Sequence, residues 1–526
     1  MFSAWRVSKM RTNQLSSVVA LTIIFTSLLA TAYGGKILLM CMQRSGHLSE
    51  FAGLAEGLLA RGHKVYMVLD EHLKEPSVFK GLDVTFMRYK SMKPEMMDTK
   101  KFDETQSKLT LEDSESAVFA LNKVHVTYDC LSTVEDKELF KRMQQEKFDF
   151  AVVDGMYFCY HIIPHNLGIP YGQLSTPLYS WLVRIHPLSG GYTACALRGK
   201  KNTFFSRLQF FVVSMIFENM LPNAFLDESK MLPHANPPVS SLRQLAKNSS
   251  LYIINLNNVI DCARPSMPNL IYVGGIAAKP PKPLPADIRE FVDSAKEGFI
   301  ICTFGSMMAK APRHIQEKLL KVFSMVKQKV LWRQEGIPAD LKIPDNVRPM
   351  SWLPQNDLLA HPNVKVFITH NGNNGQAEAV YHGVPMLGVP LAGDQFGNTD
   401  RSVDLGYGLK ANIKTDSPEE IASLVKELID NPKYETAVNK ASLILKSVPP
   451  AKDTAAYWVE HVMKYGGSHL RTTLADMSDI QFIMFDIYAF LTILLFVSLF
   501  LLKKIVCYIY RKFAGDEAKF KKKKTN

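Results

Sequence analysis

The sequence lacks the usual patterns of metal-binding residues. No Asp-x-Asp motif occurs in it, and its seven cysteines are scattered without the paired spacing of a zinc or iron–sulfur site. Two of them, Cys41 and Cys302, fall inside apolar runs that predict buried strands, so we expect them to be core residues. The sequence therefore predicts a protein that holds no metal ion, and it assigns no disulfide pair.

Positive charge is scarce once the two ends of the chain are set aside. The formal net charge is +12, but residues 503–526 hold nine basic and two acidic residues. Arg6, Lys9 and Arg11 add three more positive charges, which leaves only two for everything between. Because a nucleic-acid-binding face needs a concentrated basic patch, we expect no nucleic-acid partner.

Long apolar runs are few, and two of them lie near the ends of the chain. Residues 18–29 follow basic residues and precede Ala30-Thr31-Ala32, which is typical of a cleaved secretory signal over residues 1–32. Residues 482–502 are long enough to span a bilayer as a membrane-anchoring helix. The basic residues that follow mark residues 503–526 as a cytoplasmic tail, so the main body is expected in the lumen.

A third apolar run, residues 203–220, is interrupted by Arg207 and Glu218 and stopped by Pro222. Charges inside the run disfavour a membrane span. Three alternatives stay open for it: the wall of an apolar pocket, contact with the bilayer surface, or plain core.

The end of the chain predicts its compartment. Lys523 and Lys524 stand at the fourth and third positions from the end, which resembles the dilysine retrieval signal of endoplasmic-reticulum membrane proteins. The alternative is a basic tail that lies against anionic lipid. We expect a single-pass type I protein of the endoplasmic-reticulum membrane, in contact with membrane lipid. Asn248 begins the one N-glycosylation sequon that we find.

The elements between these runs predict two α/β domains. Strand-forming runs at residues 36–42 and 64–69 flank a helical run at 48–60, and residues 148–153 predict another buried strand. The proline-rich stretch at 279–285 is typical of a stiff linker. We therefore expect one domain over residues 33–278 and a second over residues 286–480.

Residues 351–395 hold the densest group of candidate site residues. The spacing predicts a strand over 364–369, a Gly/Asn-rich loop, a helix over 374–381 and a strand over 386–389. Such a loop presents backbone N–H groups at a helix N-terminus, where a phosphate is stabilised. His370 lies at the carboxyl end of the first strand, and Asn374 and Glu378, four residues apart, share one helix face.

The same stretch offers further groups for a nucleotide. Trp352 has a flat face for a base and Gln355 a polar edge, while Asp394 and Gln395 follow the second strand. Each residue alone has an ordinary alternative: a core tryptophan, a structural histidine, a polar loop. A Gly-rich turn between a strand and a helix is also weak by itself.

The whole string is more specific. W-L-P-Q…H-x-G-x-N-G-x-x-E…G-V-P…D-Q, which begins at Trp352, closely resembles the signature of the UDP-glycosyltransferases, the group that contains the membrane-bound UDP-glucuronosyltransferases. Near the N-terminus, GKILL…SGHLSE…RGHKV resembles the start of the same family. Three positions depart from the family: Asn371 replaces a usual glycine, and Gly375 and Gly46 replace usual serines.

The resemblance implies a role for each candidate residue. His47 is the implied catalytic base, and Asp154, at the end of a predicted strand, orients it. The alternatives are a helix-capping or solvent-facing histidine and a turn-forming aspartate. The implied UDP-sugar site comprises Ser306 and His370 at the diphosphate, Trp352 and Gln355 at the uracil and ribose, Gly372, Asn374, Gly375 and Glu378 at the phosphate and ribose, and Asp394 and Gln395 at the sugar.

We therefore expect a GT-B type fold: two Rossmann-like doubly wound α/β domains facing a cleft, plus one C-terminal transmembrane helix. The implied reaction is inverting transfer of a sugar from UDP-glucuronate or UDP-glucose to a hydroxyl of a small lipophilic acceptor. It needs no metal, since a helix terminus stabilises the leaving UDP, and no cofactor, since the UDP-sugar is a co-substrate. The rival is a non-catalytic membrane protein that binds a UDP-sugar or an apolar ligand. The sequence leaves homo-oligomerisation, the donor sugar and the acceptor open.

Overall fold

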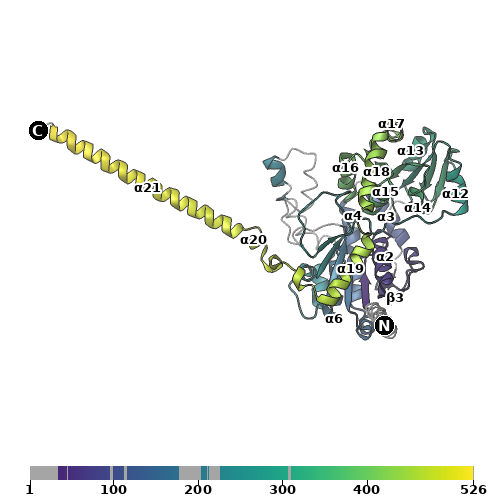
Figure 1. Cartoon of the computed structure of the whole chain (residues 1–526), viewed down its shortest axis with the longest axis horizontal. Coiled ribbons are helices and arrows are strands. Elements are labelled where there is room, and N and C mark those ends of the chain that lie inside the picture. Colours follow the sequence, from purple (N-terminus) through teal and green to yellow (C-terminus); the bar gives the residue numbers. More distant parts are fainter. Residues whose placement is uncertain are drawn as a thin grey trace, which may run out of the picture. The chain divides into compact units, whose positions relative to one another are not determined.

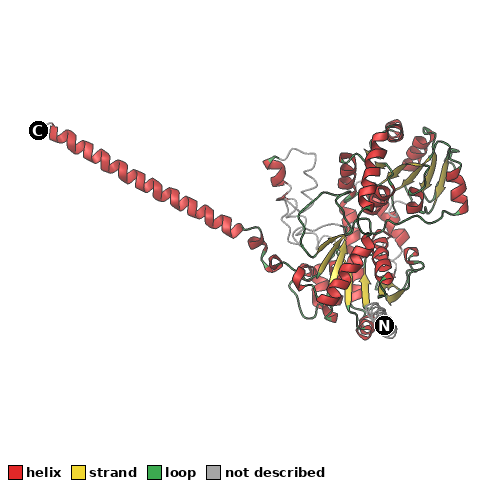
Figure 2. Cartoon of the chain, viewed as in Figure 1, coloured by secondary structure: helices red, strands yellow, loops and turns green. Residues whose placement is uncertain are grey.

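A computed structural model describes residues 34–524 apart from residues 44, 95–98, 112–114, 177–202, 210, 213–225 and 306–309 (Figure 1). The predicted signal, residues 1–32, and the predicted site residue Ser306 lie outside the described residues. The chain forms two compact units, Met1–Arg471 and Thr472–Asn526. Figure 2 shows the strands of the first unit gathered in two sheets with helices packed around each.

The first sheet is fully parallel, with the strand order β3-β2-β1-β4-β5-β6-β7. Its central strands are apolar runs buried on both faces, as a parallel sheet covered by helices requires, while the edge strand β3 is partly exposed. The order reverses between β1 and β4, and ligands of open α/β sheets bind outside the carboxyl ends of the strands at such a switch point. The strands are β1 (Lys36–Met40), β2 (Lys64–Asp70), β3 (Val84–Tyr89), β4 (Phe150–Asp154), β5 (Tyr171–Ser175), β6 (Leu251–Ile254) and β7 (Leu270–Tyr272).

The second sheet is also parallel, with the order β10-β9-β8-β11-β12-β13, and it reverses between β8 and β11. It therefore repeats the doubly wound arrangement of the first sheet, as the sequence predicts. The strands are β8 (Phe299–Thr303), β9 (Lys329–Arg333), β10 (Val347–Met350), β11 (Val364–Thr369), β12 (Met386–Gly388) and β13 (Gly408–Lys410).

Helices connect the strands and cover both sheets. Ser417 caps α17 with a complete capping box, and Pro418 stands at the first helical position. The helices of the first unit are α2 (Ser45–Ala60), α3 (Thr99–Leu111), α4 (Glu115–Val134), α5 (Lys137–Glu146), α6 (Ile162–Leu167), α10 (Glu228–Met231), α11 (Leu242–Lys247), α12 (Ala286–Asp293), α13 (Arg313–Ser324), α14 (Gln355–Leu359), α15 (Asn373–His382), α16 (Gln395–Asp404), α17 (Pro418–Asp430), α18 (Pro432–Lys446) and α19 (Ala451–Tyr465). Short 3-10 turns lie at Ser77–Phe79, Phe158–His161, Leu232–His234 and Ser468–Leu470.

The last helix of the first unit returns to the first sheet. Although α19 falls within residues 286–480, its apolar face packs in the core of the first sheet, and α19 lies against α2 (Figure 1). The approach is close, since a Cβ on Gly57 would lie 2.4 Å from the carbonyl oxygen of Lys452. Packing against this first sheet was not visible in the sequence of α19.

The cysteines behave as core and crosslinking residues. Cys41 and Cys302 are buried thiols, as predicted. Cys130 of α4 and Cys159 form a disulfide inside the core of the first sheet. In the described part of the 203–220 run, Phe204 and Phe205 are exposed, so this part is not plain core.

The second unit is mainly one long helix. A 3-10 turn at Thr473–Asp476 and the short α20 (Asp479–Phe482), which Ser478 caps, precede α21 (Phe485–Lys524). Among the described residues, Phe485–Phe513 of α21 is long and apolar enough to cross a membrane, with a mean hydropathy of 2.4. The helix begins three residues after the start of the predicted span and continues past its end at Leu502 through the basic tail.

Candidate functional site

A cavity of about 2430 Å³ lies where the carboxyl ends of strands from both sheets meet. Its wall includes residues that follow β1, β5 and β6 of the first sheet and β8 and β11 of the second. Asp154 lies just behind the wall, fully buried. The predicted site residues that line the cavity are His47, Trp352, Gln355, His370, Gly372, Asn374, Gly375, Glu378, Asp394 and Gln395.

His47 and Asp154 form a close pair at the switch point of the first sheet. His47 lies in the first turn of α2 and Asp154 ends β4, so His47 Nδ1 comes within 2.6 Å of Asp154 Oδ2. The backbone N–H groups of Met42 and Met156 also donate to this carboxylate, at 3.1 and 2.9 Å. Burial alone raises the pKa of Asp154, but His47 and the N–H donors hold it below its usual value. An ionised Asp154 therefore accepts a hydrogen bond from Nδ1–H, which fixes the tautomer of the imidazole.

His370 lies between two glycines at the switch point of the second sheet. A Cβ on Gly305 would lie 2.9 Å from His370 Cε1, and a Cβ on Gly372 would lie 2.6 Å from its Nε2, so a larger residue would displace the ring. Burial, and then the charge of Arg333, lower the pKa of His370 to about 4. The ring is therefore neutral at pH 7 and carries a single N–H donor.

The loop after His370 opens α15. Gly372 is the N-cap of this helix and brings no side chain to cap it, so the first-turn N–H groups can serve an anion. Asn371 has a φ of +61°, which confirms that this position takes the left-handed conformation and that asparagine can replace glycine here. A Cβ on Gly375 would meet Gln355 Nε2 at 3.6 Å, an ordinary contact, so the position has room for the serine that the family usually has.

Glu378 lies on α15, one turn after Asn374, and contacts Gln355 at the start of α14. Gln355 Nε2 donates to Glu378 Oε2 at 2.6 Å. Burial raises the pKa of Glu378 to about 7, although the hydrogen bond from Gln355 opposes the rise. Trp352, 58% exposed, lies on the same cavity wall. An aromatic face near a carboxylate suits a nucleoside base and its ribose hydroxyls.

Asn374 joins the N-terminus of α15 to the first domain. Its Nδ2 donates to the carbonyl of Gly46 at 3.0 Å, and its Oδ1 accepts from Asn255 Nδ2 at 2.9 Å. Asn255 is fully buried, accepts from the N–H of Gly275 at 3.0 Å, and its carbonyl accepts from Asn373 Nδ2 at 2.8 Å. The residue before His47 is thereby held against the helix that opens the predicted phosphate site.

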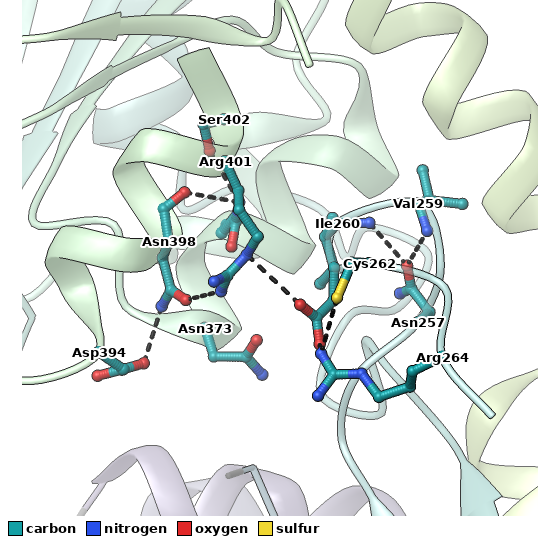
Figure 3. A network of polar contacts seen from close by, with 12 residues as sticks. Asn257, Val259, Ile260, Cys262, Arg264, Asn373, Asp394, Asn398, Arg401 and Ser402 are labelled. Carbon is teal, nitrogen blue, oxygen red and sulfur yellow. Dashed lines mark hydrogen bonds and ion pairs between the residues drawn. The ribbon is translucent and has the colours of Figure 1, made fainter. Parts of the chain in front are cut away.

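Asp394 and Gln395 begin α16 at another part of the cavity. Gln395 Oε1 accepts from the N–H groups of Leu391 and Ala392, at 2.8 and 3.1 Å, and so shapes its own loop. Asp394 Oδ2 accepts from Asn398 Nδ2 at 2.8 Å (Figure 3). One carboxylate and one amide thus lie where the resemblance implies the donor sugar.

A comparison with protein-family models decides the family. The model described as "UDP-glucoronosyl and UDP-glucosyl transferase" matches residues 35–520. The chain belongs to the UDP-glycosyltransferase family.

Curated relatives of this UDP-glycosyltransferase support the same family assignment. It is 32% identical over 486 residues to rat 2-hydroxyacylsphingosine 1-beta-galactosyltransferase, covering 89% of this chain and 87% of the relative. It is 32% identical over 414 residues to rabbit UDP-glucuronosyltransferase 2C1, covering 75% of this chain and 80% of the relative. Its relatives thus include a galactosyltransferase and a glucuronosyltransferase, which leaves the donor sugar open.

Solved structures show the same GT-B fold. A UDP-glucosyltransferase from Polygonum tinctorium superimposes with a TM-score of 0.58 at 17% identity, over 82% of this chain and 99% of that one. The spinosyn forosaminyltransferase SpnP also gives a TM-score of 0.58, at 15% identity, over 82% and 100%. At these identities the likeness concerns the fold alone.

Three features in or next to the cavity wall of this UDP-glycosyltransferase were not found from sequence. Glu50 follows His47 on α2, accepts from Thr176 Oγ1 at 2.8 Å, and has a pKa raised by burial. Asn255 links the two domains, and Arg401 of α16 pairs with Asp261 of the first domain. Of these, only Asn255 could have been predicted from the sequence, because it directly follows a strand of a parallel sheet. Asn248 is exposed at the end of α11, outside the cavity wall.

Proposed function

We propose that this UDP-glycosyltransferase moves a sugar from UDP-glucuronate or UDP-glucose to a hydroxyl of a small lipophilic acceptor, with inversion at the sugar carbon. One observation carries the proposal: the His47–Asp154 pair, 2.6 Å apart, opens onto the cavity that the nucleotide-site residues also line. A base and a donor site that share one cavity support direct transfer.

The proposed reaction is a single displacement. His47 Nε2 takes the proton of the acceptor hydroxyl as its oxygen attacks C1 of the sugar. The bond from C1 to the UDP oxygen breaks, and UDP leaves with the electron pair. Asp154 stabilises the imidazolium that forms. The N-terminus of α15, His370 and Ser306 are proposed to stabilise the charge on UDP without a metal.

The lipophilic acceptor is inferred from apolar side chains of the first domain in the cavity wall. Met42, Met156, Phe119, Val126 and Leu256 line the cavity that His47 also lines. An apolar wall around one proton-accepting group favours an acceptor with a large apolar body and a reactive hydroxyl.

The proposed location is the endoplasmic-reticulum membrane, with the two α/β domains in the lumen. The apolar segment Phe485–Phe513 supports a membrane anchor. The basic residues after the apolar run and the dilysine ending support a cytoplasmic tail and retrieval to that compartment.

One competition experiment tests the proposed activity. Microsomes that contain the full chain receive a simple phenolic acceptor with equal concentrations of UDP-glucuronate and UDP-glucose, and mass spectrometry identifies the conjugates. We expect a conjugate of one sugar to dominate. UDP binding by calorimetry without any conjugate, across a broad panel of acceptors, would instead support the non-catalytic alternative.

A further inference from the structure

A series of polar contacts, in which Asn398 and Asp261 are buried, runs from the predicted sugar site to the first domain. Asp394 Oδ2 accepts from Asn398 Nδ2 at 2.8 Å, and Asn398 Oδ1 accepts from the guanidinium of Arg401. Arg401 Nε lies 3.5 Å from Asp261 Oδ1 in an ion pair. Figure 3 shows Asp394, Asn398 and Arg401 following one another along α16, with Arg401 reaching beyond the helix.

The donors and acceptors in this series of contacts determine the orientation of the Asn398 amide. An arginine can only donate hydrogen bonds, and an ionised aspartate can only accept them. Asn398 must therefore turn its oxygen toward Arg401 and its NH2 group toward Asp394. The same NH2 group also donates to the carbonyl of Asn371 at 3.1 Å, so the loop after β11 depends on this orientation too.

Asp261 is the last residue in this series of polar contacts, and its neighbours hold it in place. It lies between β6 and β7 of the first domain, and its side chain is only 4% exposed. Arg264 also forms an ion pair with Asp261, and the backbone N–H of Asp261 donates to the carbonyl of Asn257 at 2.9 Å. The neighbouring Ile260 is buried in the core of the second sheet. Asp261 therefore belongs to a segment that both domains hold.

Stability alone gives little reason for charges here. Buried ion pairs contribute little net stability, because the loss of hydration offsets their attraction. The hydrogen bond that Arg401 gives to the amide oxygen of Asn398 strengthens the orientation in which its NH2 group faces Asp394, and this is a better reason to keep Arg401 and Asp261 beside the cavity.

We propose that Arg401 and Asp261 are positioning residues for the hexosyl group of the UDP-sugar. They hold Asn398, and through it the carboxylate of Asp394, in the orientation that binds the sugar hydroxyls. This inference rests on the proposed function, in which Asp394 grips the donor sugar. Recognition of the sugar therefore depends on a residue of the acceptor domain and on the contact between the two domains.

The test compares two ligands that differ only by the sugar. Calorimetry measures the affinities of the detergent-solubilised full chain for UDP and for UDP-glucose or UDP-glucuronate, whichever the enzyme uses. Arg401→Gln and Asp261→Asn should leave UDP affinity within about twofold but weaken UDP-sugar binding about tenfold, the effect of one charge-assisted hydrogen bond. Arg401→Lys should not restore it, because a compact ammonium does not reproduce the guanidinium fork.

A double variant and a matched control variant complete the test. The double variant Asp261→Asn/Arg401→Gln removes both charges and should be no worse than either single change, since both act through one series of contacts. Asp400→Asn is the matched control: it removes an exposed ion pair with Lys410 (2.8 Å) from the same helix, and neither affinity should change.

Asp394→Ala separates the two proposals. If it weakens UDP-sugar binding selectively while Arg401→Gln and Asp261→Asn do not, the positioning role is wrong and the proposed function stands. If Asp394→Ala leaves the ratio of the two affinities unchanged, the sugar-site assignment fails and the positioning role fails with it. Equal loss of UDP and UDP-sugar binding in the Arg401 and Asp261 variants, with a lower unfolding temperature, would indicate a merely structural role.

Discussion

Replacing Asp154 by asparagine should weaken the catalytic base without removing it. Asp154 receives His47 Nδ1 and the N–H of Met42 on one oxygen and the N–H of Met156 on the other. An asparagine has one accepting oxygen, so its NH2 group must face either the N–H of Met156 or both His47 Nδ1 and the N–H of Met42. The first orientation leaves fewer donors without an acceptor and keeps the proton on Nδ1, so Nε2 can still take a proton.

The charge effect can be estimated from the geometry. Opposite charges centred roughly 4 Å apart attract by about 4 kcal/mol at an effective dielectric constant of 20. The side chain of His47 is 22% exposed, so water reduces this value. Because the carboxylate favours the protonated imidazole, its loss should move the histidine-dependent limb of the pH–rate profile to lower pH.

The assay is turnover against pH at saturating donor and acceptor, with UDP affinity measured in parallel. We expect His47→Ala to lower turnover about 10²-fold or more, the usual effect of removing a general base. Asp154→Asn should show a smaller loss together with the shifted limb, and both variants should bind UDP nearly normally. Wild-type turnover of His47→Ala on a hydroxyl acceptor would refute the base assignment, even if every donor-site residue were correct.

Four other predictions concern the donor site, metal dependence and topology. Glu378→Ala should weaken UDP binding by about 1–3 kcal/mol in calorimetry; because the pKa of Glu378 is about 7, UDP affinity should fall as pH drops below 7, and Glu378→Gln should remove that dependence. Gly375→Ser should keep the unfolding temperature and UDP affinity at least at the wild-type level, because the position has room, and a clear loss of either would show that the space is needed. Turnover should survive exhaustive EDTA treatment, and loss that Mg²⁺ or Mn²⁺ restores would contradict the metal-free mechanism. Protease added to intact microsomes should remove only the tail, and Lys523/Lys524→Ser should release the protein from the endoplasmic reticulum; digestion of the main body without detergent would reverse the orientation.

The sequence by itself determined the family, the repeated α/β architecture and most residues of the candidate site. These features depend on short-range signals: apolar runs of strand length, a Gly/Asn turn before a helix, and a motif string with fixed spacing. The strand at Val364–Thr369 has the predicted bounds, and the helix Asn373–His382 differs from the predicted 374–381 by one residue at each end. Asn371 takes the left-handed conformation, which asparagine tolerates better than most residues.

Only the tertiary structure decided which distant residues meet. Asn374 contacts Asn255 across 119 residues and Gly46 across 328, and α19 packs on a sheet that the sequence did not connect with it. The Cys130–Cys159 disulfide and the Asp261–Arg401 ion pair were equally invisible. The contacts between domains depend on how two separately formed sheets dock, while the disulfide and α19 depend on how helices pack on the first sheet. No periodicity or spacing within one segment encodes either. The motif thus located the residues of the candidate donor site, while the packing of the domains brought His47, Asn255 and Asp261 of the first domain close to them.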